Sequence, residues 1–234
     1  MTDDTHVSTG CGALDDLLGG GVERGTVTQF YGPPAAGKTN VALSTAVEVA
    51  AEGGTAVYVD TEGVSVARFE QLLRARADDP DAASSRVVLS AAHDFEEQAE
   101  AVRDAGDFAE RADLVVVDSA TGFYRLARDD EDGGDALRRV ADQVAHLLSL
   151  ARKHDLAVVV TNQVFTDVDS DSDRVRPLGG HTLNHWTGVV VRLDRFRGGN
   201  RRATLEKHRS KPDGDQVRFQ LTDAGVEGVD AGQY

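Results

Sequence analysis

The stretch TQFYGPPAAGKTNVAL, residues 28–43, decides the fold of this chain. It contains the spacing G-x-x-x-x-G-K-T, formed by Gly32, Gly37, Lys38 and Thr39. β-Branched and aromatic residues before Gly32 predict a strand, and apolar residues at helical spacing after Thr39 predict a helix. A glycine-rich loop between a strand and a helix binds phosphate, because backbone N–H groups and the helix N-terminus converge on anionic oxygens. The alternative is a glycine-rich turn that matches by chance, and the strand–loop–helix context argues against it.

The motif predicts a contact for two of its side chains. Lys38 would reach the β- and γ-phosphates of a nucleotide, and the hydroxyl of Thr39 would bind Mg²⁺. The residues that we expect to bind the nucleotide within this stretch are Gly32, Pro33, Pro34, Ala35, Ala36, Gly37, Lys38, Thr39 and Asn40.

Length and cysteine content restrict the class of protein. At 234 residues we expect one domain, residues 1–234. The single cysteine, Cys11, excludes a disulfide framework and is typical of a reducing cytosol; we expect it to be a buried residue without chemistry. No apolar run approaches the ~18 residues of a membrane helix, and residues 1–10 have no signal-peptide pattern, so a cytoplasmic protein is expected.

The charge balance is strongly acidic. Asp and Glu total 40 against 25 Lys and Arg, a net charge of −15. Acidic runs at 78–81, 128–135 and 167–173 fall between periodic segments, which argues against long disordered tails. A surface for a partner is one interpretation. We favour solvation in concentrated salt, where repulsion is screened within ~3 Å at 1 M; the composition resembles that of halophilic proteins.

Strands and helices alternate along the chain. Strands are predicted at 27–31, 56–60, 86–90, 114–118 and 156–163, and helices at 95–109 and 135–154. Continuous apolar strands of this kind form a parallel sheet covered on both faces. Strands at 189–195, 202–209 and 216–222, joined by short polar turns, predict an antiparallel extension. The fold class is therefore α/β, with a mostly parallel sheet flanked by helices and extended at the C-terminus.

Three polar residues at strand ends complete a candidate site. Asp118 follows an apolar strand and can hold Mg²⁺ through a water, opposite Thr39. Glu62, in VYVDTEG, lies where a carboxylate could polarise an attacking water, and Gln163 could hydrogen-bond a γ-phosphate. Each could instead be an ordinary strand-end residue. For Asp118, a position about 80 residues after a phosphate loop favours the metal site.

Six segments in this order resemble the ATPase core of the RecA/RadA recombinase superfamily, and most closely its short archaeal members. They are residues 8–40, VYVDTEGVSVARFEQL (57–72), LVVVDSATGFYR (114–125), TNQV (161–164), RPLGGHTLNHW (176–186) and LEKHRSKPDG (205–214). The phosphate loop is common to many ATPases, whereas DSATGFYR, TNQV and PLGGHTLNH are specific to this branch. The resemblance covers nearly the whole chain and implies a RecA-like P-loop ATPase core.

The resemblance implies further roles. ATP and Mg²⁺ would be the cofactors, Glu62 the water-activating residue and Gln163 the γ-phosphate sensor. Arg68 matches an arginine that packs on the adenine. Lys207, Arg209 and Lys211 lie near the basic residues that reach the ATP of a neighbouring subunit, although a charged antiparallel strand explains them equally well.

The departures from the family concern DNA. The N-terminal helix-hairpin-helix domain and the Phe-x-x-Ala linker are absent from the sequence, so we expect a monomer or homodimer. The two expected DNA-facing loops are acidic, and their aromatic residues Phe123, Tyr124 and Phe165 are better explained as core. We expect weak binding of single-stranded DNA. The candidate DNA-binding residues are Arg125, Arg128, Arg174 and Arg176.

We therefore expect an ATP-binding DNA repair and recombination protein that assists the RadA recombinase, with slow ATP hydrolysis. A KaiC-like signalling ATPase that does not act on DNA is the first alternative. An interaction module that keeps the nucleotide only as a structural ligand is the second.

The acidity generates a prediction. Unscreened repulsion among the carboxylates should destabilise the chain in dilute buffer. We expect a clearly lower melting temperature by circular dichroism in about 0.1 M KCl than in about 2 M KCl, since the Debye length falls from about 10 Å to below 3 Å. Equal melting temperatures would mean that the acidic residues serve a partner instead of the solvent.

Overall fold

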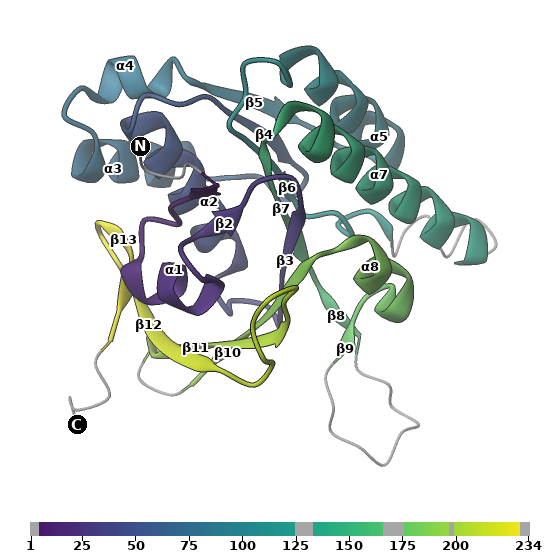
Figure 1. The fold of residues 1–234 in the computed structure, drawn as a ribbon. Helices are drawn as coiled ribbons and strands as arrows, with labels where there is room; N and C mark the ends of the chain where they lie inside the picture. The colour runs from purple at the N-terminus through teal and green to yellow at the C-terminus, as the bar shows by residue number, and fades with distance from the viewer. Residues whose placement is uncertain (1–4, 125–132, 166–175, 197–198, 230–234) are drawn as a thin grey trace.

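The computed structural model describes residues 5–124, 133–165, 176–196 and 199–229. Within them a nine-stranded sheet forms the centre of the molecule, in the order β13-β12-β11-β10-β3-β7-β6-β4-β5 (Figure 1). Its strands are β3 (Val27–Tyr31), β4 (Ala56–Asp60), β5 (Val87–Ala91), β6 (Leu114–Asp118), β7 (Ala157–Asn162), β10 (Val189–Arg195), β11 (Arg201–Lys207), β12 (Gln216–Thr222) and β13 (Gly225–Gly228).

The sheet has a parallel and an antiparallel part. β10, β3, β7, β6, β4 and β5 pair in parallel, whereas β11, β12 and β13 add to β10 in antiparallel register. The predicted parallel sheet and its C-terminal antiparallel extension are both confirmed. The reversal at β10 matters for the site, because the start of β11 lies at the same edge of the sheet as the end of β10.

Helices cover both faces of the sheet. α2, α3 and α4 lie on one side, with α1 against the antiparallel strands, and α5 and α7 lie on the other (Figure 1). The helices are α1 (Gly12–Leu18), α2 (Lys38–Ala51), α3 (Val66–Arg76), α4 (Pro80–Ser84), α5 (Phe95–Asp104), α7 (Gly133–His154) and α8 (Gly180–Trp186). Two small antiparallel pairs, β1 (His6–Val7) with β2 (Val22–Glu23) and β8 (Val164–Phe165) with β9 (Arg176–Pro177), lie outside the main sheet.

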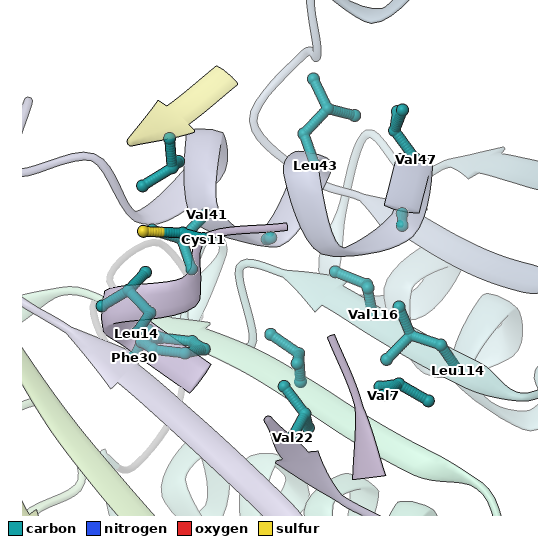
Figure 2. Packing of buried hydrophobic residues seen from close by; sticks show 14 of the residues in the cluster. Val7, Cys11, Leu14, Val22, Phe30, Val41, Leu43, Val47, Leu114 and Val116 are labelled. Carbon is teal, nitrogen blue, oxygen red and sulfur yellow. The ribbon is translucent and has the colours of Figure 1, made fainter. Parts of the chain in front are cut away.

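The apolar runs of the strands supply two separate cores. In β6, Leu114 and Val116 join the cluster under α1 and α2, and Val115 and Val117 join the cluster under α5 and α7. The alternation follows from the two-residue repeat of a strand. Figure 2 shows the first cluster, in which Leu114 and Val116 lie across from side chains of α2. Cys11 is buried in the same cluster, as expected.

Several predicted boundaries differ from the observed ones. The strands predicted at 86–90 and 156–163 lie at 87–91 and 157–162, and the helix predicted at 135–154 begins at Gly133. The helix predicted at 95–109 ends at Asp104 and continues as a 3₁₀ turn, η1 (Ala105–Phe108), where Gly106 disfavours regular helix. Its predicted N-cap is present, since Asp94 accepts a hydrogen bond from Glu97 N at 2.8 Å. β11 begins at Arg201 and ends at Lys207, earlier than predicted at both ends. In the described ranges, no helix combines the length and the apolarity that crossing a bilayer needs.

Candidate functional site

A pocket of about 350 Å³ opens at the sheet edge where β3, β4, β6 and β7 end. Parallel strands bring the segments that follow them to one edge, which is where open α/β sheets bind ligands. The residues that line the pocket are Pro34, Ala35, Gly37, Lys38, Thr39, Asn40, Glu62, Gln163, Arg201 and Leu221.

Two glycines determine the path of the loop. A Cβ atom on Gly32 would lie 2.2 Å from the carbonyl oxygen of Leu193 in β10, so no side chain fits there. Gly37 has φ = 108°, a left-handed conformation that favours glycine, and it is the N-cap of α2. No side chain caps this end of α2, so the first N–H groups of the helix remain available to an anion.

Lys38 is buried at the base of the pocket. Its side chain is 7% exposed, and its Nζ donates to the carbonyl oxygens of Gly32 at 3.0 Å and Pro33 at 3.2 Å. Burial lowers the pKa of Lys38, and the charges of Glu62 and Asp118 partly oppose this effect. The ammonium group is therefore held near the loop by neutral carbonyls, without a direct carboxylate partner among the described residues.

Asp118 is fully buried at the end of β6. Its Oδ2 accepts a hydrogen bond from Tyr58 Oη at 2.8 Å, its Oδ1 accepts from Thr161, and the hydroxyl of Thr39 lies close enough to lower its pKa. Burial raises the pKa of Asp118, whereas these three hydroxyls lower it. The oxygens of Asp118 thus accept hydrogen bonds from hydroxyls, and its predicted contact with Mg²⁺ through a water stays a prediction.

Glu62 and Gln163 come together at the rim. Gln163 Nε2 donates to Glu62 Oε1 at 2.9 Å, across 101 positions of sequence. Asp60 orients the turn that carries Glu62, because its Oδ1 accepts from the backbone N–H groups of Glu62 at 3.0 Å and Gly63 at 2.9 Å. Gln163 N in turn donates to the hydroxyl of Thr121 at 3.2 Å. The side chain predicted to sense a γ-phosphate, Gln163, and the one predicted to activate the attacking water, Glu62, are therefore direct neighbours.

Arg68 lies beside the pocket, in α3. Its Nε donates to Asn40 Oδ1 at 3.1 Å, and its Nη2 donates to the carbonyl oxygen of Thr222 at 2.8 Å. Arg68 thus connects α3 to the start of α2 and to the end of β12. Its predicted contact with an adenine ring stays a prediction.

The three basic residues predicted to reach a neighbouring subunit have partners within the chain. Lys207 Nζ donates to the carbonyl oxygens of Asn184 at 2.5 Å and Thr187 at 2.6 Å, at the C-terminal end of α8. Arg209 pairs with Glu23, and Lys211 Nζ donates to the Asp16 carbonyl at 2.6 Å. These contacts stabilise the antiparallel strands against α8 and α1; the subunit contact stays untested.

The predicted DNA-facing residues mostly lie outside the described residues. This applies to Arg125, Arg128 and Arg174, and to the side chains of Arg176 and Phe165. Tyr124 is 8% exposed and belongs to the core under α5 and α7, against which Phe123 packs.

The sequence interpretation missed two lining residues, Arg201 and Leu221. Both come from the antiparallel extension, about 160 positions or more after the loop, and no local motif marks them. The sequence feature that pointed towards them was the predicted antiparallel extension, which brings the start of β11 back to the edge of the sheet where β10 ends.

The site fits a nucleotide with bound Mg²⁺. Lys38 lines the pocket, and within the described ranges its amine is bonded only to carbonyl oxygens of the loop, so it is available to an anion. Among the described residues, no group of three or more His, Cys, Asp or Glu forms a dedicated metal cage. This agrees with Mg²⁺, which commonly keeps waters and binds through substrate phosphates and few protein ligands.

The fold and the pocket together define a P-loop protein with a RecA-like core. Comparison with known families is more specific: a model of the Rad51 family matches residues 3–229. The chain belongs to the Rad51 family.

Two relatives of known sequence share the same name. The chain is 76% identical over 233 residues to the DNA repair and recombination protein RadB of Halobacterium salinarum, covering 99% of both chains. It is 42% identical to the protein of the same name from Methanococcoides burtonii, covering 92% of this chain and 95% of that one. A solved structure, the crystal structure of the RadB recombinase, superimposes with a TM-score of 0.82 at 38% identity, covering 96% of this chain and 100% of that one.

The buried lysine leads to a pH-dependent prediction. Burial lowers the pKa of Lys38 below 10.5 in the folded state. Between the lowered pKa and 10.5, the unfolded state therefore binds more protons at this residue than the folded state does. The stability of the unliganded protein should therefore gain a contribution as pH rises through the lowered pKa towards 10.5, and Lys38→Met should lack this contribution.

We expect unliganded Lys38→Met to be at least as stable as the wild type at neutral pH, with strongly weakened nucleotide binding. Chemical unfolding of both proteins between neutral pH and 10.5 measures the difference between their free energies of unfolding. Tyr58 is present in both proteins, so its titration cancels in this difference. A variant much less stable than the wild type at neutral pH would contradict the inferred cost of burying Lys38.

Proposed function

We propose that this chain is an ATP-binding protein of DNA repair and homologous recombination that assists or regulates a RadA-type recombinase. One observation carries the proposal: the hydrogen bond between Glu62 and Gln163 at the mouth of the phosphate-loop pocket. It joins a residue suited to activate water with one suited to report a γ-phosphate. The similarity to proteins named for recombination, along nearly the whole chain, supports the biological role.

The loop residues would bind ATP. The N–H groups of the loop and of the first turn of α2 would surround the β-phosphate, and Lys38 would exchange its bonds to Gly32 and Pro33 for phosphate oxygens. Bound Mg²⁺ would neutralise phosphate charge and polarise the terminal phosphoryl group. Thr39 would hold the ion directly, and Asp118 would hold the Thr39 hydroxyl or a water of the ion in place.

Glu62 would act on the attacking water. Its carboxylate is exposed at the pocket rim and is already engaged by Gln163 at 2.9 Å. To accept a hydrogen bond from water in line with the γ-phosphate, Glu62 would have to share or release the amide of Gln163. This requirement supports weak, slow hydrolysis, with ATP binding as the main switch.

Gln163 connects the pocket to the strand pair β8 and β9. Its carbonyl oxygen accepts from Leu178 N at 2.9 Å, and the neighbouring Asn162 donates to the Leu178 carbonyl at 2.8 Å. The segment from 164 to 177 begins and ends at this point, where β8 pairs with β9. A shift of Gln163 towards a γ-phosphate would therefore move both ends of the segment together.

The remaining properties follow the same proposal. The chain would work as one cytoplasmic ATPase domain, monomeric or homodimeric, with RadA as its partner. Binding of single-stranded DNA would be weak, because an excess of 15 negative charges opposes phosphate binding. The family match favours recombination over a KaiC-like signalling role. An interaction module that keeps the nucleotide only as a structural ligand stays the second alternative.

Glu62→Gln tests the catalytic part. The amide can still accept from Gln163, so the pocket should keep its shape and its ATP affinity, while phosphate release in a single-turnover assay should fall by about 10²-fold or more. Glu70→Gln, an equal charge change on the exposed face of α3, is the matched control. Hydrolysis at the wild-type rate by Glu62→Gln would show that Glu62 is only a turn residue.

Co-elution with RadA tests the biological role. We expect a monomer or dimer in light scattering in about 2 M KCl, the condition in which charge repulsion is screened. We also expect it to bind RadA and single-stranded DNA modestly, with ATP changing one or both of these affinities. A closed ring that binds neither in any nucleotide state would move the assignment to the KaiC-like class.

A further inference from the structure

The topology of the sheet brings an arginine from the antiparallel extension to the phosphate loop. β10 runs parallel to β3, with Arg192 beside Tyr31, so β10 continues past the start of the loop. β11 runs back along β10, with Arg201 paired to Arg195. The first residue of β11 therefore lies at the edge of the sheet where the loop begins, and Arg201 lines the pocket.

Arg201 packs directly against the loop. A Cβ atom on Gly37 would lie 3.1 Å from Arg201 Cδ and 3.2 Å from its Nε, with the ring of Phe219 at 3.4 Å on the same side. The Nε atom of Arg201 is buried and has no hydrogen-bond partner within the described ranges. Its Nη1 donates to the carbonyl oxygen of Gly199 at 2.7 Å, which fixes the guanidinium plane.

The positive charge of Arg201 is not neutralised nearby. No ion pair found within the described residues includes Arg201, although the chain has 40 acidic residues against 25 basic ones. Burial and the neighbouring Arg195 lower the pKa of Arg201, so its surroundings disfavour the charge. A partly buried guanidinium with an unused N–H and no carboxylate partner is suited to an anionic ligand.

We propose that Arg201 binds the non-terminal phosphates of a nucleotide held in the loop of its own chain. The inference rests on the proposed ATP binding at this loop and assigns a second cation to it besides Lys38.

The strand order determines which phosphates Arg201 contacts. β3, which carries the loop, lies between β10 and β7. Glu62 and Gln163 follow β4 and β7 on one side of β3, and Arg201 and Leu221 lie on β11 and β12 on the other. A nucleotide with its terminal phosphate at Glu62 and Gln163 therefore extends towards Arg201 with the phosphates that ATP and ADP have in common.

Calorimetric titration of the wild type and Arg201→Gln with ATP and with ADP tests the proposal. Loss of a charge-assisted hydrogen bond should weaken both nucleotides by the same factor, about tenfold. An effect on ATP alone would place Arg201 at the terminal phosphate and overturn the assignment. Arg201→Met, which keeps the packing of the stem without a polar end, should have the same effect and serves if the glutamine variant does not fold.

Arg202→Gln is the matched control on the next position of β11. Arg202 also has a buried Nε without a partner, but its Nη2 pairs with Asp194 at 3.2 Å and its guanidinium lies 4.8 Å from the Phe196 ring centre. Its substitution should leave both affinities unchanged. Equal affinities in Arg201→Gln and Arg202→Gln would overturn the inference and leave the proposed ATP binding intact. Failure of the wild type to bind either nucleotide would reject the proposed function itself.

Discussion

The contact between β10 and the phosphate loop is the constraint on which the site depends. A Cβ atom on residue 32 would lie 2.2 Å from the carbonyl oxygen of Leu193. Only glycine therefore allows the loop to leave β3 this close to β10. The loop is thus positioned by a strand that follows it by about 160 residues. The same strand then directs β11 back along the sheet, which places Arg201 against Gly37.

Ionisable groups in the pocket and in the sheet beneath it lie in surroundings that disfavour their charges. Burial lowers the pKa of Lys38 and raises those of Asp118 and Tyr58, and each group is held by hydrogen bonds to its neighbours. Such an arrangement lowers the stability of the unliganded chain and keeps these groups in place beside the site where an anion would bind. The close hydroxyl and carboxylate partners explain why the buried Asp118 is tolerated.

The acidic composition and the local use of basic residues act on different scales. The net charge of −15 governs the surface as a whole, whereas individual cations have specific partners. Lys207 and Lys211 cap the ends of α8 and α1 through carbonyl oxygens, and Arg209 pairs with Glu23. A contact of these residues with another subunit would break these bonds. The other subunit would have to supply hydrogen-bond acceptors of similar strength to offset the loss.

Residue types and their spacing were enough to predict the phosphate loop, a parallel sheet of apolar strands, its antiparallel extension and the strand-end positions of Asp118, Glu62 and Gln163. These depend on spacing within one element, which residue type and periodicity specify directly. Tertiary structure alone decided that Gln163 donates to Glu62, that hydroxyls of Tyr58 and Thr161 hold Asp118, and that Arg201 reaches the loop. Such contacts depend on which strands become neighbours, and the energy that selects the neighbours is spread over the two cores of the whole sheet.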